Sequence, residues 1–347
     1  MQTVGELLRD AAVGTDVDVV AAEFDSVEVP AGLAYALGID AKAGGPIRAE
    51  ATVDPLPGGS IVVLAGPDVV GSRNVDGLRA FAAAANVPVA NTWGAKGVFP
   101  WDSPHHMGTC GLQLRDFELL GFADYDGVVA TGIDENESPW DRFALAPVVN
   151  IPPSDLGRLA TEVAPATRPI PANDLYTRLS GVAQPGFVDD RVPLHPARAV
   201  ADLRAVLAPG GVVTADAGVP GLWVARTFPT TEPGTVVVPA VATPGIGAAL
   251  ALIAALRGFD AIAVTGEPLD HRTLAVLELS TELSAAVVVD VWGADGPVHR
   301  TADHLKHLQS AVRDPGVSIV DVPVDVSLTR KLVSAAGPVV AWGGLPA

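Results

Sequence analysis

Acidic residues follow several apolar runs of this sequence, at the points where buried strands would end. The run Ala261–Thr265 is followed by Gly266-Glu267-Pro268, and Asp216 follows a shorter run that begins at Val212. Open α/β sheets place their ligand sites at the carboxyl ends of such strands. Asp216 could therefore contact a ligand, although an aspartate in this position could equally cap a turn.

Two other polar groups have simpler explanations than ligand binding. His105 and His106 have the composition of a metal pair, but adjacent side chains point apart in an extended chain, so we expect a solvated loop. Asp134, Glu135 and Glu137 are likewise expected to form a solvated acidic loop. No residue is predicted to be catalytic.

Charge and composition exclude several classes of protein. The net charge is −18, from 40 acidic and 22 basic residues, and such a surface repels phosphate backbones, so we expect no nucleic-acid binding. Cys110 is the only cysteine, which excludes an intramolecular disulfide and a thiolate zinc site and predicts a small buried side chain. No apolar run reaches the roughly 20 residues of a membrane span. We therefore expect a cytoplasmic protein with no membrane contact.

Short apolar strands alternate with helical patterns in two regions of the chain, which predicts parallel βαβ units. The first region holds strands near 61–64, 87–90, 127–132 and 147–151, with a helix over 75–85. The second holds strands near 212–214, 236–238, 261–265, 286–289 and 317–320, with helices over 196–207, 246–256, 274–283 and 302–312. The predicted fold is α/β, with two doubly wound parallel-sheet domains in tandem.

Glycine and proline clusters indicate the domain boundaries. Residues 1–55 are predicted to be a short N-terminal segment, with one helix near 4–11 and one strand at 17–20. Residues 56–161 form the first domain, Rossmann-like in pattern, and 193–347 form the second. The polar, proline-rich residues 162–192 are predicted to link them.

The run Asn86–Pro100 reads NVPVANTWGAKGVFP, and His106-Met107-Gly108 and Gly111 follow it. This pattern resembles the central domain of thiamine diphosphate (ThDP) enzymes of the acetolactate synthase type. Some relatives bind FAD or an ADP group in that domain. The resemblance therefore implies that Lys96 or Arg142 could meet the phosphate of FAD or of a CoA-type nucleotide.

The second domain carries two further stretches of this kind. Val213–Gly218 reads VTADAG, with Trp223 five positions on, and Pro244–Ala249 reads PGIGAA. They resemble the opening strand and the glycine loop of the C-terminal, cofactor-binding domain of the same enzymes. The resemblance implies a ThDP-binding type of fold, in which Asp216, Gly245 and Gly266 stand at the cofactor.

In that family the strand matching 261–266 leads into Gly-Asp-Gly, the next strand ends in Asn-Asn, and together they hold the Mg²⁺ that anchors the cofactor's diphosphate. The matching positions here read Gly266-Glu267-Pro268 and Val291-Trp292. Glu267 could still bind Mg²⁺ and Asp290 could supply a second carboxylate, but proline has no N–H for a phosphate and tryptophan has no oxygen ligand. The resemblance implies a vestigial cofactor and metal site at Glu267 and Asp290.

Enzymes of this family also carry a pyrimidine-binding domain with an activating glutamate, which residues 1–55 are too short to form. We therefore expect a noncatalytic binding, regulatory or scaffolding unit that holds no cofactor alone. The alternative is one subunit of a split ThDP-dependent lyase or carboligase, acting on 2-oxo acids or 2-hydroxyacyl-CoA, in which a partner chain brings the pyrimidine domain and ThDP and Mg²⁺ bind. Either a homo-oligomer or such a partner is expected.

Overall fold

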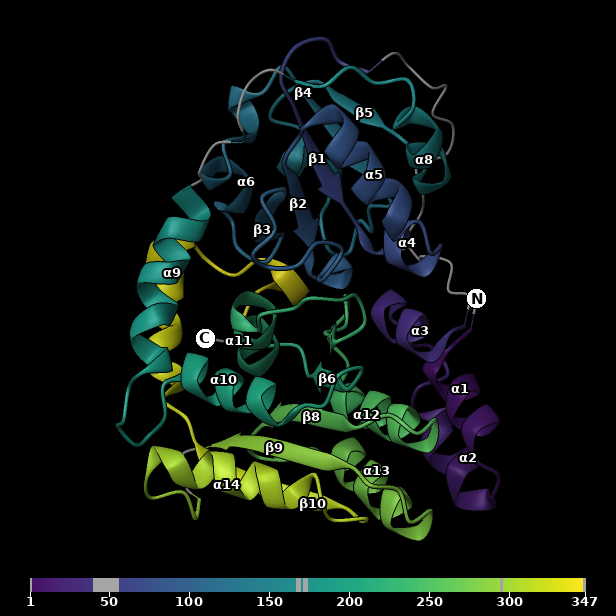
Figure 1. The fold of residues 1–347 in the computed structure, drawn as a ribbon. Helices are drawn as coiled ribbons and strands as arrows, with labels where there is room; N and C mark the ends of the chain where they lie inside the picture. Colours follow the sequence, from purple (N-terminus) through teal and green to yellow (C-terminus); the bar gives the residue numbers. More distant parts are fainter. Residues whose placement is uncertain (1, 40–55, 167–169, 171–173, 294–295, 346–347) are drawn as a thin grey trace. The chain divides into compact units, whose positions relative to one another are not determined.

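A computed structural model of the chain describes residues 2–39, 56–166, 170, 174–293 and 296–345. These residues form two compact units. The first-sheet unit comprises Pro30–Gly181, Pro229–Gly234 and Leu332–Ala347, and the second-sheet unit comprises Met1–Val29, Val182–Phe228 and Thr235–Lys331. Each unit holds one five-stranded parallel sheet, which confirms the predicted α/β class with two doubly wound parallel-sheet domains (Figure 1).

The predicted domain boundaries at residues 55, 161 and 192 follow the chain, whereas the compact units follow packing, so the boundaries stay a prediction. Residues 40–55 of the predicted N-terminal segment lie outside the described residues, as do 167–169 and 171–173 of the predicted linker. The rest of that linker is more regular than expected, because it contains helix α9 (Asp174–Phe187).

The first sheet has the strand order β3-β2-β1-β4-β5. Its strands are β1 (Ile61–Ala65), β2 (Val89–Thr92), β3 (His106–Cys110), β4 (Gly127–Thr131) and β5 (Val148–Asn150). Every residue of β1, β2 and β4 is buried, as expected for parallel strands covered on both faces. Alternate residues enter two cores: Val63 packs with Leu78 and Phe81, whereas Val62 packs with Phe117 and Phe143.

Helix α5 (Val75–Ala85) shows how the sequence covers this sheet. Its buried residues recur at helical spacing, from Val75 through Leu78 and Phe81 to Ala85. The helix ends at Asn86, whose left-handed backbone (φ 52°) is a conformation that asparagine tolerates. Apart from α9, the N-terminal helices and the helices that cover the second sheet, the described helices are α3 (Ala31–Leu37), α4 (Pro67–Gly71), η1 (Trp93–Ala95), α6 (Asp116–Leu119), η2 (Phe122–Asp124), α7 (Trp140–Phe143), η3 (Pro153–Asp155), α8 (Leu156–Leu159), α15 (Thr329–Ala336) and η5 (Ala341–Gly343).

The second sheet has the strand order β10-β9-β8-β6-β7. Its strands are β6 (Val212–Ala215), β7 (Val236–Val237), β8 (Ala261–Gly266), β9 (Val288–Gly293) and β10 (Ser318–Pro323). The chain moves to one side after β6 and to the other side afterwards, so the topological switch point lies between β6 and β8. In the first sheet the topological switch point lies between β1 and β4.

Helices cover both faces of the second sheet: α10 (Pro196–Val206), α11 (Val219–Thr227), α12 (Ile246–Leu256), α13 (His271–Glu282), α14 (Thr301–Ala311) and η4 (Val326–Leu328). Thr214 donates to the carbonyl of Gly247 in α12, whereas Asp290 meets His304 of α14. Thr214 of β6 is in register with Ala263 of β8, which is in register with Val289 of β9. Thr214 and Val289 therefore point to the same face of the sheet, and Asp290, the next residue, points to the other. Side chains alternate along a strand, so α12 and α14 lie on opposite faces.

The N-terminal residues correct one expectation. Helix α1 (Val4–Ala11) forms as predicted, with a capping box between Thr3 and Glu6. The predicted strand at 17–20 is wrong, because these residues belong to helix α2 (Thr15–Ala22). Its buried residues are Val17, Val20 and Ala21, a helical spacing that a four-residue apolar run hides.

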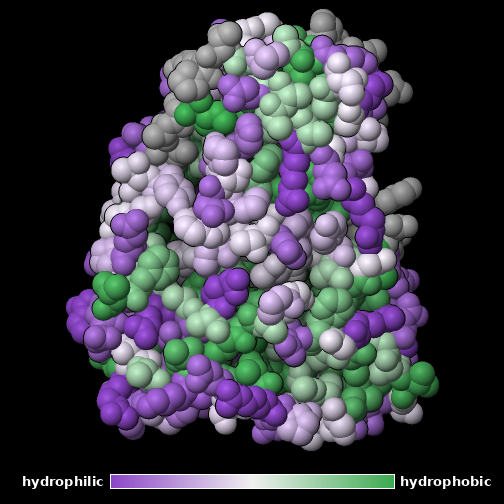
Figure 2. Space-filling model, viewed as in Figure 1, coloured by the Kyte–Doolittle hydropathy of each residue, from purple (hydrophilic) through white to green (hydrophobic). Residues whose placement is uncertain are grey.

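The outer face of α14 is polar. Thr301, His304, Leu308 and Ala311 form its buried stripe, while most of the residues between them, such as Asp303, Lys306 and Gln309, are charged or polar. Figure 2 shows hydrophilic side chains along the lower edge, where Figure 1 places α14. None of the described helices is long and apolar enough to cross a membrane.

Candidate functional site

Asp216 lies at the switch point of the second sheet, directly after β6. Its Oδ1 accepts a hydrogen bond from the backbone N–H of Gly247 (2.8 Å), and its Oδ2 accepts one from the hydroxyl of Thr265 (2.6 Å). Burial raises the pKa of Asp216, while the bonds from Thr265 and Gly247 act against that rise. Both oxygens of this carboxylate are therefore engaged by the protein's own groups.

Two helices begin beside Asp216, and a carboxylate of the chain caps each of them. Gly247 belongs to the first turn of α12, where unpaired N–H groups could otherwise bind an anion. Asp270 accepts from the N–H groups of Arg272 (2.8 Å) and Thr273 (3.2 Å) at the start of α13. The first residues of the two helices are in contact at Gly245, since a Cβ on Gly245 would lie only 2.8 Å from the Cβ of Arg272.

Glu267 and Gly266 lie at the end of β8, next to β9. Gly266 is in register with Trp292, and the N–H of Glu267 donates to the carbonyl of Trp292 (3.0 Å). The carboxylate of Glu267 lies over Gly293, where a Cβ would collide with its Oε2. Glu267 is thus placed beyond the strand ends, on the side of Gly293.

Asp290 is fully buried inside the second sheet rather than at its edge. Its Oδ1 lies 3.1 Å from Nε2 of His304, and its Oδ2 accepts a hydrogen bond from the indole N–H of Trp292 (2.9 Å). Side-chain alternation in β9 puts Asp290 on the face covered by α14. The structure therefore commits the carboxylate of Asp290 to His304 and Trp292, and a metal site at Glu267 and Asp290 stays a prediction.

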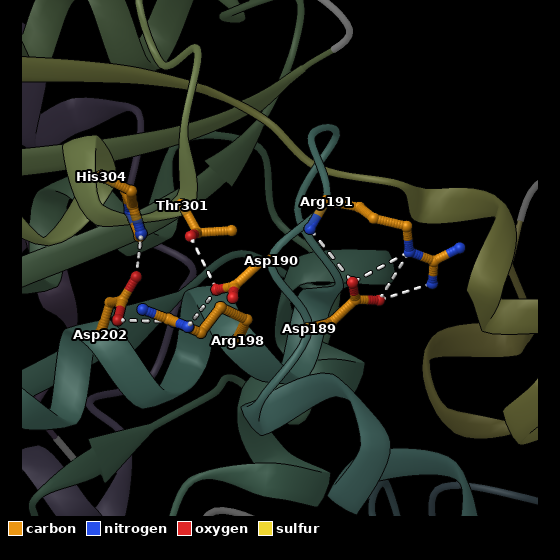
Figure 3. A network of polar contacts seen from close by, with 7 residues as sticks. All are labelled: Asp189, Asp190, Arg191, Arg198, Asp202, Thr301 and His304. Atoms are coloured by element: carbon orange, nitrogen blue, oxygen red, sulfur yellow. Dashed lines mark hydrogen bonds and ion pairs between the residues drawn. The ribbon is translucent and has the colours of Figure 1, made fainter.

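His304 joins Asp290 to a second buried carboxylate, Asp202 of α10. Its Nδ1 lies 3.0 Å from Asp202 Oδ2, and Asp202 Oδ1 accepts from Nε of Arg198 (3.1 Å). Figure 3 shows this chain of contacts continuing from Arg198 to Asp190 and Thr301. Burial alone lowers the pKa of His304, but the carboxylates of Asp290 and Asp202 outweigh it and raise the pKa to about 9. His304 is therefore an imidazolium at neutral pH and donates from both ring nitrogens.

The roles of His304 and Asp202 were not predicted from the sequence. One signal was available: Asp290 interrupts an apolar run, and a buried carboxylate requires a charged or hydrogen-bonding partner. Nothing in the sequence identified that partner, because His304 follows Asp290 by 14 residues and Asp202 precedes it by 88.

A Mg²⁺–diphosphate group does not fit the residues at this edge. A hard divalent cation needs several oxygen ligands, usually carboxylates and waters. Asp290 is committed to His304 and Trp292, and Asp216 is committed to Gly247 and Thr265. Across the described part of the chain, no three His, Cys, Asp or Glu side chains are grouped so that they could hold a metal ion.

The candidate phosphate contacts of the first sheet have structural roles. Arg142 in α7 donates to the carbonyls of Gly111 (3.0 Å) and Gln113 (3.1 Å), and so fixes the loop that follows β3. Lys96 is buried after η1, where its charge acts on His106. A nucleotide phosphate at these two residues stays a prediction.

Three expectations about polar residues of the first sheet can be compared with the structure. Cys110 is buried, as predicted. The solvated loop predicted at His105-His106 is wrong, because His106 begins β3 and burial, with help from Lys96, lowers its pKa to about 4. The solvated acidic loop is wrong for Asp134 and Glu137, which are both buried. Burial raises the pKa of Asp134, and it raises the pKa of Glu137 to about 8. Only Glu135 and its neighbour Asn136 are exposed there.

Comparison with known proteins agrees with this architecture. Residues 59–166 match the family described as thiamine pyrophosphate enzyme, central domain. No curated protein matches the chain. Similar solved structures include a protein from Mycobacterium smegmatis described as a thiamin diphosphate-dependent enzyme (TM-score 0.59, 15% identity) and the thiamine diphosphate-dependent 4-hydroxybenzoylformate decarboxylase of Rhodococcus jostii RHA1 (TM-score 0.60, 16% identity).

Each of these alignments covers 76% of this chain and 61% of the other, so the chain spans about three-fifths of the length of the similar proteins. At such low identity the structural match concerns the fold, whereas the central-domain match rests on sequence. Residues 59–166 therefore match the central domain of the thiamine pyrophosphate enzyme family, and the aligned 76% of the chain has a fold similar to that of these thiamine diphosphate-dependent enzymes.

Proposed function

We propose that this chain is a diverged, acetolactate synthase-like member of the ThDP enzyme family that acts as a noncatalytic binding, regulatory or scaffolding unit. One observation carries the proposal: the carboxylate of Asp290 is occupied by His304 and by the indole of Trp292. Trp292 itself stands in the position where the resemblance expects an asparagine ligand. The asparagine ligand of Asn-Asn therefore has no equivalent at its matching position, and Glu267 stands at the position of the Gly-Asp-Gly aspartate.

Isothermal titration calorimetry tests this proposal. The purified chain is titrated with ThDP in the presence of millimolar Mg²⁺, with the Rhodococcus decarboxylase as the positive control. We expect no saturable heat from this chain under conditions in which the control binds. Saturable binding of ThDP that depends on Mg²⁺ would overturn the proposal.

The second candidate is one subunit of a split ThDP-dependent lyase or carboligase. It is favoured by the preserved turn at the switch point, where Gly245 leads into α12 and Asp216 still faces Gly247. In this case a partner chain of the pyrimidine-domain type would complete the site, and decarboxylation or ligation of a 2-oxo acid, or cleavage of a 2-hydroxyacyl-CoA, would be the reaction.

Gentle purification of the tagged chain from its source cells tests this second candidate. A stoichiometric partner chain and turnover that requires added ThDP would support it. A stable complex that binds no ThDP would contradict it, and the noncatalytic proposal would then stand.

A further inference from the structure

A segment of the first-sheet unit crosses the carboxyl edge of its sheet. We call this segment, Gly132–Ser138, the strap. It leaves β4, and the carbonyl of Gly132 accepts from the N–H of Asp68 (3.0 Å), at the loop after β1. At its other end the carbonyl of Glu137 abuts Gly111, after β3, where a Cβ would lie 2.9 Å away. Since the strand order is β3-β2-β1-β4, the strap passes over the ends of β1 and β2.

The side chain of Glu137 ties the strap to the turn that follows β2. Its Oε2 accepts from the N–H of Gly94 in η1, the turn after β2 (3.1 Å), and the hydroxyl of Thr92 contacts the same carboxyl group. Gly94 is required there, since a Cβ would collide with Oε1 and approach Pro67 Cβ to 3.0 Å. The carboxyl group therefore sits between the segments that follow β1 and β2.

This position is the one at which open α/β sheets bind ligands, close to the switch point between β1 and β4. The loops after those two strands are in direct contact, because a Cβ on Gly66 would collide with the carbonyl of Gly132. Nearby hydroxyls of Thr131 and Ser138 are buried without a hydrogen-bond partner. Two unpartnered hydroxyls therefore lie at the two ends of the strap.

We propose that the strap is a closable cover over the ligand-binding edge of the first sheet, and that the protonated carboxyl group of Glu137 is its latch. With the proton in place, the group is neutral and tolerates burial between Gly94, Thr92 and Pro67. Loss of the proton leaves a buried anion whose donors are the N–H of Gly94 and the hydroxyl of Thr92, and solvation of that anion favours release of the strap.

Burial and a neighbouring carboxylate oppose ionisation of Glu137. The titratable side chains on the elements around Glu137 are Asp134 on the strap, Asp68 in α4, Lys96 after η1 and His106 in β3. Among these, the charge of Asp134 acts on Glu137, and burial together with that charge raises the pKa of Glu137 to about 8, against the hydrogen bonds from Thr92 and Gly94. In the open strap the pKa would return to its ordinary value of 4.5, so opening releases a proton and becomes easier as the pH rises towards 8, and the effect is complete above that pH.

Hydrogen–deuterium exchange of the full chain tests this latch. After correction for intrinsic exchange, we expect the protection of peptides covering residues 132–138 to fall by up to about tenfold per pH unit between pH 6 and pH 8 and to level off above pH 8. Protection of β1 in the same unit should stay constant. Glu137→Gln keeps an oxygen for Gly94 and cannot ionise, so the protection of its strap should not change over this range.

Glu135→Gln is the matched control, because Glu135 is exposed on the same strap and its loss should leave the wild-type pH response. A wild-type strap whose protection is the same at pH 6 and pH 8 would overturn the proposal, as would an equal fall in Glu137→Gln. If that variant does not fold, the wild-type profile decides alone.

Discussion

Asp290 shows how one residue decides the chemistry of the second sheet. In β9 it is a carboxylate surrounded by valines, and a buried charge of this kind persists only when it is paired. The imidazolium of His304 and the indole of Trp292 supply the pairing. A carboxylate used in this way stabilises the fold and is withdrawn from the sheet edge, where a metal ligand would be needed.

Replacement of His304 by alanine is the first prediction. The variant leaves Asp202 and Asp290 buried without their shared cation, and loss of one partner of a buried charged group costs about 3–5 kcal/mol of unfolding free energy. Urea unfolding at pH 7 measures this loss. His299→Ala is the control, because His299 is exposed and its removal should cost little. A His304→Ala variant as stable as this control would contradict the pairing.

The same residue predicts a pH dependence for the wild-type protein. The pKa of His304 is raised to about 9 in the folded chain, against an ordinary value near 6.5. The folded state therefore binds a proton that the unfolded state loses first, so the stabilisation is complete below pH 6.5 and is lost as the pH rises to about 9. Urea midpoints at pH 6.5, 7.5 and 9 measure the effect, and His304→Ala should lack this component.

At the scale of elements, the start of α12 explains why Asp216 survives without a ligand. The carboxylate satisfies the N–H of Gly247 and the hydroxyl of Thr265, and so ties β6 and β8 to the helix that crosses between them. A ligand-binding aspartate and a capping aspartate are indistinguishable in the sequence. Whether Asp216 caps α12 or is available to a ligand depends on where α12 begins, and the start of α12 is set by the packing of Gly245 against α13.

Asp216→Ala is therefore predicted to loosen one element rather than the whole sheet. Loss of a cap costs about 0.5–2 kcal/mol. Amide exchange at Ile246–Leu250 should accelerate, while exchange in β9 stays as in the wild type. The control is Asp260→Ala, an exposed aspartate just before β8. Equal protection of α12 in both variants would show that Asp216 is not its cap.

The elements also show what the sequence could and could not predict. Strands of the two sheets follow from apolar runs bounded by glycine and proline, and helix α5 follows from its spacing, since these signals are local. Helix α2 did not, because Val17–Val20 is too short for its period to show. Glu137 and His304 could not be placed, because their burial depends on segments that meet only in the folded chain.

At the scale of the molecule, we predict that the chain self-associates or binds a partner. Large apolar side chains are exposed on the single chain, and in the second-sheet unit these include Val13, Val19, Val188, Val241 and Leu274. Burial of such area against another surface is favourable by about 25 cal/mol per Å². Light scattering should give a mass of at least twice 35.4 kDa for a homo-oligomer. A monodisperse monomer with no co-purifying chain would contradict this expectation.

The two units should also respond separately to damage, because each is assembled from three distant chain segments around its own sheet. Helices α1 and α2 precede the first sheet in sequence but belong to the second-sheet unit, where Glu23 of the segment after α2 pairs with Arg272 of α13 (3.0 Å). In His304→Ala, exchange should therefore accelerate in α1 and α2 together with β8 and β9, more than in β1 and β4. Strap variants such as Glu137→Gln should leave α1 and α2 unchanged. If α1 and α2 followed the first sheet instead, packing would not define the cooperative unit, and the division along the chain at residue 55 would describe its stability better.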